Sequence, residues 1–281
     1  MSEAQSSRTL SVVVTGASAG IGAALVRSLA AEGHRVFACA RRADALVEAT
    51  GNGRLATPIA CDVSSDAAVA ELGKRVLQDA GRVDAVVNCA GAYGVIGAVD
   101  EIEGPRWWKS LQVNLYGTFL VSKTFIPAMR RAGGGRIVNF SGGGAFSPLP
   151  RYSAYAVSKA GIVRLTETMA VELAPAKIWV NAVAPGFVAT EIHKATLEAG
   201  PERSGAELYN MTVEKMERGA VPIEVPVRLV HFLLSPQAAG LTGRTISASF
   251  DPWESPEFMS TIAKQKDLYT MQRINLEHLK K

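Results

Sequence analysis

The chain of 281 residues contains only three cysteines, and this shortage already excludes one class of site. Cys39, Cys61 and Cys89 are odd in number and lie too far apart for the ligand spacing of a zinc site. Each one closes or follows an apolar run that is typical of a strand. We therefore expect buried, reduced thiols, in keeping with a cytoplasmic protein.

Histidine is also scarce, and its four positions do not have the spacing of metal ligands. These positions are His34, His193, His231 and His278. We therefore expect no metal site. His193 lies in a polar segment, where a solvated loop histidine is the expected interpretation and contact with a substrate is the alternative.

Long runs of charge and long apolar runs are both missing. The formal net charge is +4, and basic residues cluster only in pairs such as Arg41-Arg42, so no nucleic-acid partner is expected. The first ten residues lack an apolar core, so we expect no secretory signal. Uncharged stretches such as Ile137–Pro150 are interrupted by glycine and proline and are too short to span a bilayer, so no membrane partner is expected.

What the chain does have is a regular alternation of strand-like and helix-like segments. Strands are predicted at Leu10–Thr15, Arg35–Ala40, Leu55–Cys61, Val83–Asn88, Arg136–Phe140, Ile178–Val183 and Thr245–Ser249. Helices are predicted at Ala23–Glu32, 43–50, Ser65–Ala80, Trp107–Arg131, Tyr152–Ala174 and Pro226–Leu234. This pattern predicts an α/β fold, a doubly wound parallel sheet of about seven strands with helices on both faces. With no linker and no repeat, residues 1–281 are expected to form one domain.

Two segments fall outside the alternation. Residues 191–221 are long and polar and follow the carboxyl end of a parallel strand, where ligands bind, so we expect a lid over a substrate pocket. A surface excursion is the alternative. Residues 254–281 form a C-terminal extension, in which Ser260–Leu279 has the pattern of an amphipathic helix.

A glycine-rich turn joins the first predicted strand to the first helix. Gly16, Gly20 and Gly22 do not follow the usual G-x-G-x-x-G spacing, but a strand–turn–helix setting lets the backbone approach a pyrophosphate at a helix N-terminus. The second strand ends in Ala40 rather than a carboxylate, and Arg41 follows. A guanidinium pairs with a 2′-phosphate, so NADP(H) is preferred and NAD(H) stays possible.

Tyr155 and Lys159 are spaced so that they lie on one face of a helix. An ammonium beside a phenol favours the phenolate and lowers its pKa from about 10. Such a pair can exchange a proton near neutral pH.

Together these motifs resemble the short-chain dehydrogenase/reductases over about residues 8 to 250. The matching stretches are Thr15–Gly22, Asn88–Gly91, Val113–Gly117, the Tyr155 and Lys159 pair, Asn181–Gly186 with Val188 and Thr190, and Leu241–Gly243. The resemblance implies a hydride transfer between a nicotinamide and a carbonyl or alcohol carbon. It assigns Tyr155 as acid/base, Lys159 as the residue that tunes it, and Asn114 as the anchor of a water in the proton relay.

The resemblance also implies contacts with the cofactor and association into a homodimer or homotetramer through the helices Trp107–Arg131 and Tyr152–Ala174. The predicted cofactor-binding residues, besides Tyr155 and Lys159, are Gly16, Ser18, Gly20, Ile21, Gly22, Arg41, Asp62, Val63, Asn88, Ala90, Gly91, Pro185, Gly186, Val188 and Thr190.

The chain departs from the family at the serine that donates to the substrate oxygen. Counting back thirteen residues from Tyr155 reaches Gly142, and the nearest serine, Ser141, is one position early. Either Ser141 turns in and is catalytic, or another group stands in, such as a backbone N–H of Gly142–Gly144 or a substrate hydroxyl, or catalysis is weakened. Near the end of the last strand, Asp251 and Trp253 either line the pocket or anchor the tail.

The sequence therefore predicts an NADP(H)-preferring oxidoreductase that acts on a carbonyl or secondary alcohol, with Tyr155 as acid/base. One alternative is an NAD-dependent alcohol dehydrogenase. Another is a cofactor-binding sensor or scaffold of the same fold with weakened catalysis.

Overall fold

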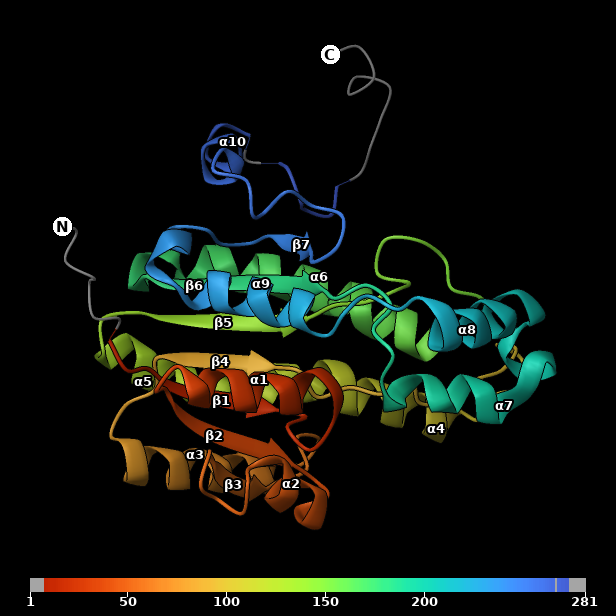
Figure 1. Cartoon of the computed structure of the whole chain (residues 1–281), viewed down its shortest axis with the longest axis horizontal. Helices are drawn as coiled ribbons and strands as arrows, with labels where there is room; N and C mark the ends of the chain where they lie inside the picture. Colours follow the sequence, from red (N-terminus) through yellow and green to blue (C-terminus); the bar gives the residue numbers. More distant parts are fainter. Residues whose placement is uncertain (1–7, 266, 273–281) are drawn as a thin grey trace.

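The computed structural model describes residues 8–265 and 267–272. Within them a single parallel sheet has the strand order β3-β2-β1-β4-β5-β6-β7. The strands are β1 (Ser11–Thr15), β2 (Arg35–Ala40), β3 (Thr57–Ala60), β4 (Ala85–Asn88), β5 (Gly135–Phe140), β6 (Ile178–Ala184) and β7 (Thr245–Ser247). Their order reverses between β1 and β4, which are both central, and such a switch point is where ligands bind in doubly wound folds. The predicted seven-stranded parallel sheet is confirmed (Figure 1).

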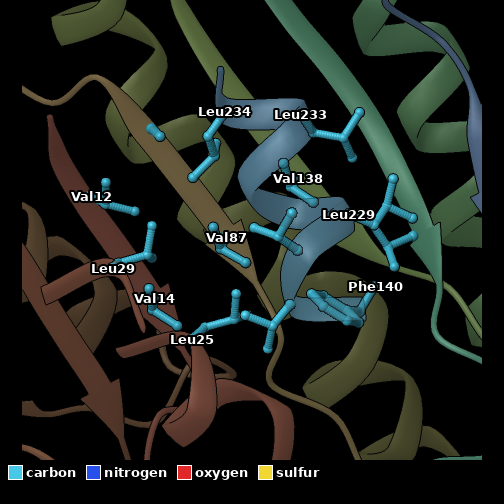
Figure 2. Close-up of a cluster of buried hydrophobic side chains, with 14 of the residues drawn as sticks. Val12, Val14, Leu25, Leu29, Val87, Val138, Phe140, Leu229, Leu233 and Leu234 are labelled. Carbon is cyan, nitrogen blue, oxygen red and sulfur yellow. The ribbon is translucent and has the colours of Figure 1, made fainter. Parts of the chain in front are cut away.

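Helices cover both faces of this sheet. They are α1 (Gly20–Ala31), α2 (Ala43–Ala49), α3 (Asp66–Ala80), α4 (Gly104–Leu111), α5 (Gly117–Arg131), α6 (Ser153–Leu173), α7 (Lys194–Ser204), α8 (Ala206–Arg218), α9 (Glu224–Leu234) and α10 (Phe258–Lys264). Alternate strand residues serve the two faces, since Val12 and Val14 pack with α1 and α9, whereas Val13 packs with α3, α5 and α6. Figure 2 shows the first cluster, to which Leu25 and Leu29 of α1 and Leu229 of α9 all belong.

The long helix predicted at Trp107–Arg131 is interrupted. It begins at Gly104, and a π-helical turn, Gln112–Tyr116, separates α4 from α5. A π-turn inserts one extra residue into the helical ladder and is frequently found at functional sites. Hydrophobic periodicity cannot show it, because the chain stays helical on both sides. Asn114 lies in the middle of this turn.

The polar segment 191–221 is largely helical. A short 3-10 turn, Glu191–His193, leads into α7 and α8, and α7 is kinked at Gly200, whose φ of +71° is outside the helical range. Figure 1 shows α7 and α8 beyond the arrowheads of β4 and β5, at the carboxyl edge of the sheet. This is the edge at which the predicted site residues gather.

The helix predicted at Ser260–Leu279 is wrong over much of its length. Helix α10 ends at Lys264, after burying Phe258 and Ile262 on the core. The chain then runs beside β7, where the Tyr269 carbonyl accepts a 2.8 Å hydrogen bond from the Thr245 N–H. An unpaired group on an edge strand is a strong partner for backbone, and this pairing replaces the helix. Residues 273–279 of the predicted helix lie outside the described residues.

Candidate active site

Tyr155 and Lys159 lie in the first two turns of α6, and both side chains are buried, with exposed fractions of 7% and 4%. The Lys159 Nζ atom lies 5.5 Å from the centre of the Tyr155 ring. It donates a 2.7 Å hydrogen bond to the carbonyl of Phe140, the last residue of β5. The pair is therefore held at the carboxyl end of a central strand.

Burial dominates the titration of this pair. It raises the pKa of Tyr155 above its ordinary value of 10.0, and it lowers the pKa of Lys159 from 10.5 to about 8. The Tyr–Lys spacing predicts a lowered pKa for the Tyr155 phenol. The protein's own groups do not lower it. The physical reason is that desolvation penalises both charged forms, and Lys159 faces the ring of Tyr155.

Asn114 ties the loop after β4 to α6. Its side chain donates to the Ala92 carbonyl at 2.9 Å and to the Ser158 hydroxyl at 3.0 Å, and it accepts from the Ala92 N–H at 2.9 Å. The π-turn places this fully buried amide between the two elements. Gly91 lies beside it, since a β-carbon there would come within 3.5 Å of both the Asn114 Oδ1 and the Lys159 Nζ atoms. The loop carrying Gly91 is thereby fixed against the Tyr155–Lys159 pair.

Gly142 faces the Tyr155 hydroxyl directly. A β-carbon on Gly142 would overlap the phenol oxygen, whereas one on Gly143 would enter open space. The Ser141 N–H pairs with the Val183 carbonyl at 2.9 Å, and its buried hydroxyl finds no hydrogen-bond partner within the described ranges. The structure thus places the glycine, not the neighbouring serine, opposite the Tyr155 hydroxyl.

The glycine-rich turn is shaped to hold a phosphate group close to the backbone. Gly16 has φ +67°, and a β-carbon there would overlap the Ala90 backbone, while one on Gly22 would overlap the Gly16 carbonyl. Helix α1 begins at Gly20, and no side chain of the described residues caps its first turn. Free N–H groups and the positive end of the helix dipole therefore point outward, as a pyrophosphate requires. The residues fit a dinucleotide.

A guanidinium lies at the outer end of this turn. Arg42, the neighbour of the predicted Arg41, reaches the glycine-rich turn, with its Nη2 atom 3.4 Å from the Ser18 hydroxyl. Asp62 accepts hydrogen bonds from the Ser64 N–H at 2.9 Å and from the Ser64 hydroxyl at 2.7 Å. Val63, also predicted to contact the cofactor, is buried, and a β-carbon on Gly117 would overlap it.

Other predicted residues form the floor of the site. Asn88 donates to Ser122 and to Asn139, each at 2.9 Å, so its amide belongs to a buried network that joins β4, β5 and α5. The Ala90 N–H donates to the Thr15 hydroxyl at 3.1 Å. These bonds hold the carboxyl ends of the central strands together beneath the pair.

The remaining predicted residues belong to two borders of the site. Pro185, Gly186 and Val188 follow the end of β6, and Val188 is buried. Ile21 packs on the core beneath α1. Thr190 lies against the glycine-rich turn, because a β-carbon on Gly20 would come 3.1 Å from its methyl group.

An aromatic cluster that sequence patterns missed surrounds Tyr155. The ring of Tyr93 packs edge-on against Tyr155 at 4.7 Å and Tyr152 at 5.1 Å. The Tyr93 hydroxyl lies 3.0 Å from His193 Nδ1, and His193 stacks on Phe187 at 3.8 Å. The only signal for Tyr93 is its place shortly after the carboxyl end of β4.

His193 corrects an expectation. It is buried, with 6% of its surface exposed, and is not a solvated loop histidine. Burial lowers its pKa from 6.5 to about 4, and the charge of Lys215 adds to this effect, while a hydrogen bond with the Val188 backbone opposes it. The imidazole is therefore neutral at pH 7.

Trp253 belongs to the core rather than to the site. It is buried, donates to the Ala248 carbonyl at 3.0 Å and packs near Phe232, so it anchors the tail.

Within residues 8–265 and 267–272 there is no group of three or more His, Cys, Asp or Glu side chains that could hold a metal ion. No helix in those ranges is long and apolar enough to cross a membrane.

Comparison with known proteins identifies this arrangement. A family model described as short chain dehydrogenase matches residues 11–200. The short-chain reductase protein NovJ of Streptomyces niveus is 37% identical over 247 residues, which cover 83% of this chain and 90% of that protein. An actinorhodin polyketide ketoreductase variant solved with NADPH has a TM-score of 0.76 and 33% identity, covering 85% of this chain and 95% of the other.

NAD⁺-bound xylitol dehydrogenase has a TM-score of 0.75 and 30% identity, covering 85% of this chain and 96% of that structure. The solved neighbours thus include both an NADPH complex and an NAD⁺ complex. The chain belongs to the short-chain dehydrogenase/reductase family, as an oxidoreductase that acts on a CH–OH or C=O group with a nicotinamide cofactor.

Proposed function

We propose that this protein is an NADP(H)-preferring ketoreductase in which Tyr155 exchanges the proton with the substrate oxygen. The observation that carries the proposal is the buried Tyr155–Lys159 pair, held at the carboxyl end of β5 and bordered by Gly91 and Gly142. A bound nicotinamide supplies or accepts the hydride. Residues of the glycine-rich turn would hold its pyrophosphate, and Lys159 would lie near its ribose.

The chain's own residues then have separate tasks. Tyr155 holds its proton at neutral pH because burial raises its pKa, which suits a proton donor to a carbonyl that is being reduced. Lys159, whose pKa falls to about 8, supplies positive charge beside the phenol as that proton leaves. Asn114 keeps the loop that carries Gly91 in place, and the water relay assigned to it by resemblance remains part of the proposal.

Gly142 leaves the substrate oxygen without the usual serine donor. We propose that a backbone N–H of Gly142–Gly144 or a hydroxyl of the substrate takes that place, because Gly142 faces the phenol and Ser141 does not contact it. The glycine also supports a second candidate function, a sensor that binds the cofactor and has weakened catalysis. A turnover assay with NADPH and a panel of ketones, comparing the wild type with Tyr155→Phe, separates the two.

The preference for NADP(H) rests on the end of β2. Ala40 leaves no carboxylate there to accept from a ribose 2′-hydroxyl, and Arg41 and Arg42 follow directly, with the Arg42 guanidinium beside Ser18. An NAD-dependent alcohol dehydrogenase stays the alternative, as one structural neighbour is an NAD⁺ complex. Titration of the protein with NADPH and NADH measures the preference directly.

Residues 191–221, which we call the lid, support a closed substrate pocket. The Tyr152 hydroxyl lies 2.8 Å from the Thr196 hydroxyl, Arg151 donates to the Glu202 carbonyl at 2.7 Å, and Arg203 donates to the Ile96 carbonyl at 3.1 Å. The cluster of buried and partly buried side chains between the lid and Tyr155 is apolar and aromatic. It consists of Tyr93, Ile96, Leu149, Tyr152, Ile192, Ala195, Ala199 and Leu208. We propose a substrate with an apolar or aromatic body beside its carbonyl.

We also propose that the enzyme is homo-oligomeric and cytoplasmic. Large apolar side chains are exposed on the helices that the family resemblance places at subunit contacts, namely Trp108, Phe119, Val157 and Val171. The three cysteines are free. Light scattering coupled to size-exclusion chromatography measures the mass in solution, and a monomer would contradict the oligomeric part of the proposal.

A further inference from the structure

An ion pair joins the outer end of the cofactor site to the lid. The Nη2 atom of Arg42 lies 3.0 Å from a carboxylate oxygen of Glu191, and the same nitrogen lies 3.4 Å from the Ser18 hydroxyl of the glycine-rich turn. Arg42 follows β2, and Glu191 is the first residue of the lid, 149 positions later in the chain. The Arg42 guanidinium thus contacts both the glycine-rich turn and the lid, which lie far apart in the sequence.

The surroundings fix this ion pair at the cofactor site. Thr190, the residue before Glu191, lies against Gly20 at the start of α1. The lid therefore begins across the turn that is shaped for the pyrophosphate. Arg42 and Glu191 keep 56% and 51% of their side-chain surfaces exposed, so an incoming ligand can reach both.

The carboxylate of Glu191 is ionised at neutral pH. Its hydrogen bond with Arg42 and the charge of that guanidinium lower its pKa, with a further contribution from Lys194, whose Nζ atom lies 3.8 Å away. A second anion at this place would meet both the guanidinium that it needs and the carboxylate that repels it.

We propose that Glu191 is a cofactor-selectivity residue that competes with a ribose 2′-phosphate for Arg42. This inference rests on the proposed nicotinamide-dependent function. A phosphate monoester carries more charge than a carboxylate and binds a guanidinium bidentately, so it displaces Glu191. A free 2′-hydroxyl leaves the ion pair intact and donates to the carboxylate. The start of the lid is then released by NADP(H) and held by NAD(H), so cofactor identity and lid position are linked.

The first test measures dissociation constants by calorimetry for NADPH and NADH with the full-length protein. Glu191→Gln keeps the shape of the side chain and removes its charge. We expect NADPH to bind about two- to fivefold more tightly, the range for loss of an exposed competing ion pair, and NADH to bind equally well or more weakly. Glu198→Gln is the matched control, because it removes an exposed carboxylate from the same lid away from Arg42, and it should change neither constant.

The second test is a double-mutant cycle. An Arg42→Ala background lacks the guanidinium for which Glu191 and the 2′-phosphate compete. Glu191→Gln should therefore no longer tighten NADPH binding in that background. If the gain persists there, the carboxylate repels the phosphate directly and competition for Arg42 is wrong. If Glu191→Gln leaves the ratio of the two constants unchanged while the wild type binds both cofactors, the inference fails and the proposed function stands. If the wild type binds neither cofactor, both fail.

Discussion

The α-carbon of Gly142 directs its open side at the hydroxyl oxygen of Tyr155, so that any β-carbon at position 142 would overlap the phenol. The family's serine therefore cannot be restored here without moving Tyr155, the proposed acid/base residue. Tyr155 has little room to move, because it is buried and the ring of Tyr93 packs against it at 4.7 Å. The observed position of the Tyr155 phenol therefore requires a glycine at position 142.

Gly142→Ser is accordingly expected to impair the enzyme rather than improve it. Displacement of the phenol by a fraction of an ångström to one ångström should lower kcat/KM by about 10- to 100-fold. Steady-state kinetics with the best ketone of a panel measure the loss. Gly143→Ser is the matched control, since its side chain would enter open space, and its loss should be much smaller. A clear gain in kcat/KM for Gly142→Ser would show that a serine donor was simply missing.

Asn114 is expected to contribute mainly to stability. Asn114→Ala removes three hydrogen bonds and leaves the partly buried Ala92 N–H and carbonyl without their side-chain partner. Unsatisfied groups of this kind should lower the free energy of unfolding by about 1–3 kcal/mol. Urea denaturation measures the change. Ser158→Ala removes only one of these bonds and should lower the free energy of unfolding by less. Equal losses in the two variants would argue against Asn114 as the residue that ties the loop after β4 to α6.

His193 should make the protein less stable in acid. Its pKa is about 4 in the folded chain and 6.5 ordinarily, so between these values the unfolded chain binds a proton that the folded chain does not. The stabilisation is complete above pH 6.5 and is lost as the pH falls towards 4, by up to about 3 kcal/mol. Denaturant unfolding at a series of pH values should show this slope.

The matched variants identify the group that titrates. His193→Phe should flatten the acid slope, whereas Tyr93→Phe keeps the imidazole and should retain the slope with a lower overall stability. Parallel pH profiles for the wild type and His193→Phe would contradict the assignment.

The sheet and its helices were predictable because local patterns determine them. Runs such as Val12–Val14 are apolar on both faces, and the glycines at 16, 20 and 22 mark a strand–turn–helix unit. The prediction of a helix in the tail is wrong because the edge of β7 offers Thr245 as a backbone partner for Tyr269. A helical pattern in the sequence cannot reveal this pairing. The π-turn at Asn114 stayed hidden inside a continuous helical pattern.

The pairing of Tyr93 with His193 was out of reach for a different reason. The two residues lie 100 positions apart, and only the folded lid brings them together. The same holds for Arg42 and Glu191. Tyr155 and Lys159, in contrast, lie within one helix, and their spacing alone was enough to place them together.

Turnover with and without the Tyr155 hydroxyl tests the central claim most directly. The wild type and Tyr155→Phe are incubated with NADPH and a panel of ketones, and NADPH oxidation is followed while cofactor binding is measured separately. We predict turnover by the wild type and a loss of at least about 100-fold in Tyr155→Phe, with NADPH binding retained. Equal rates in the two proteins, or NADPH binding without turnover in either, would contradict the account.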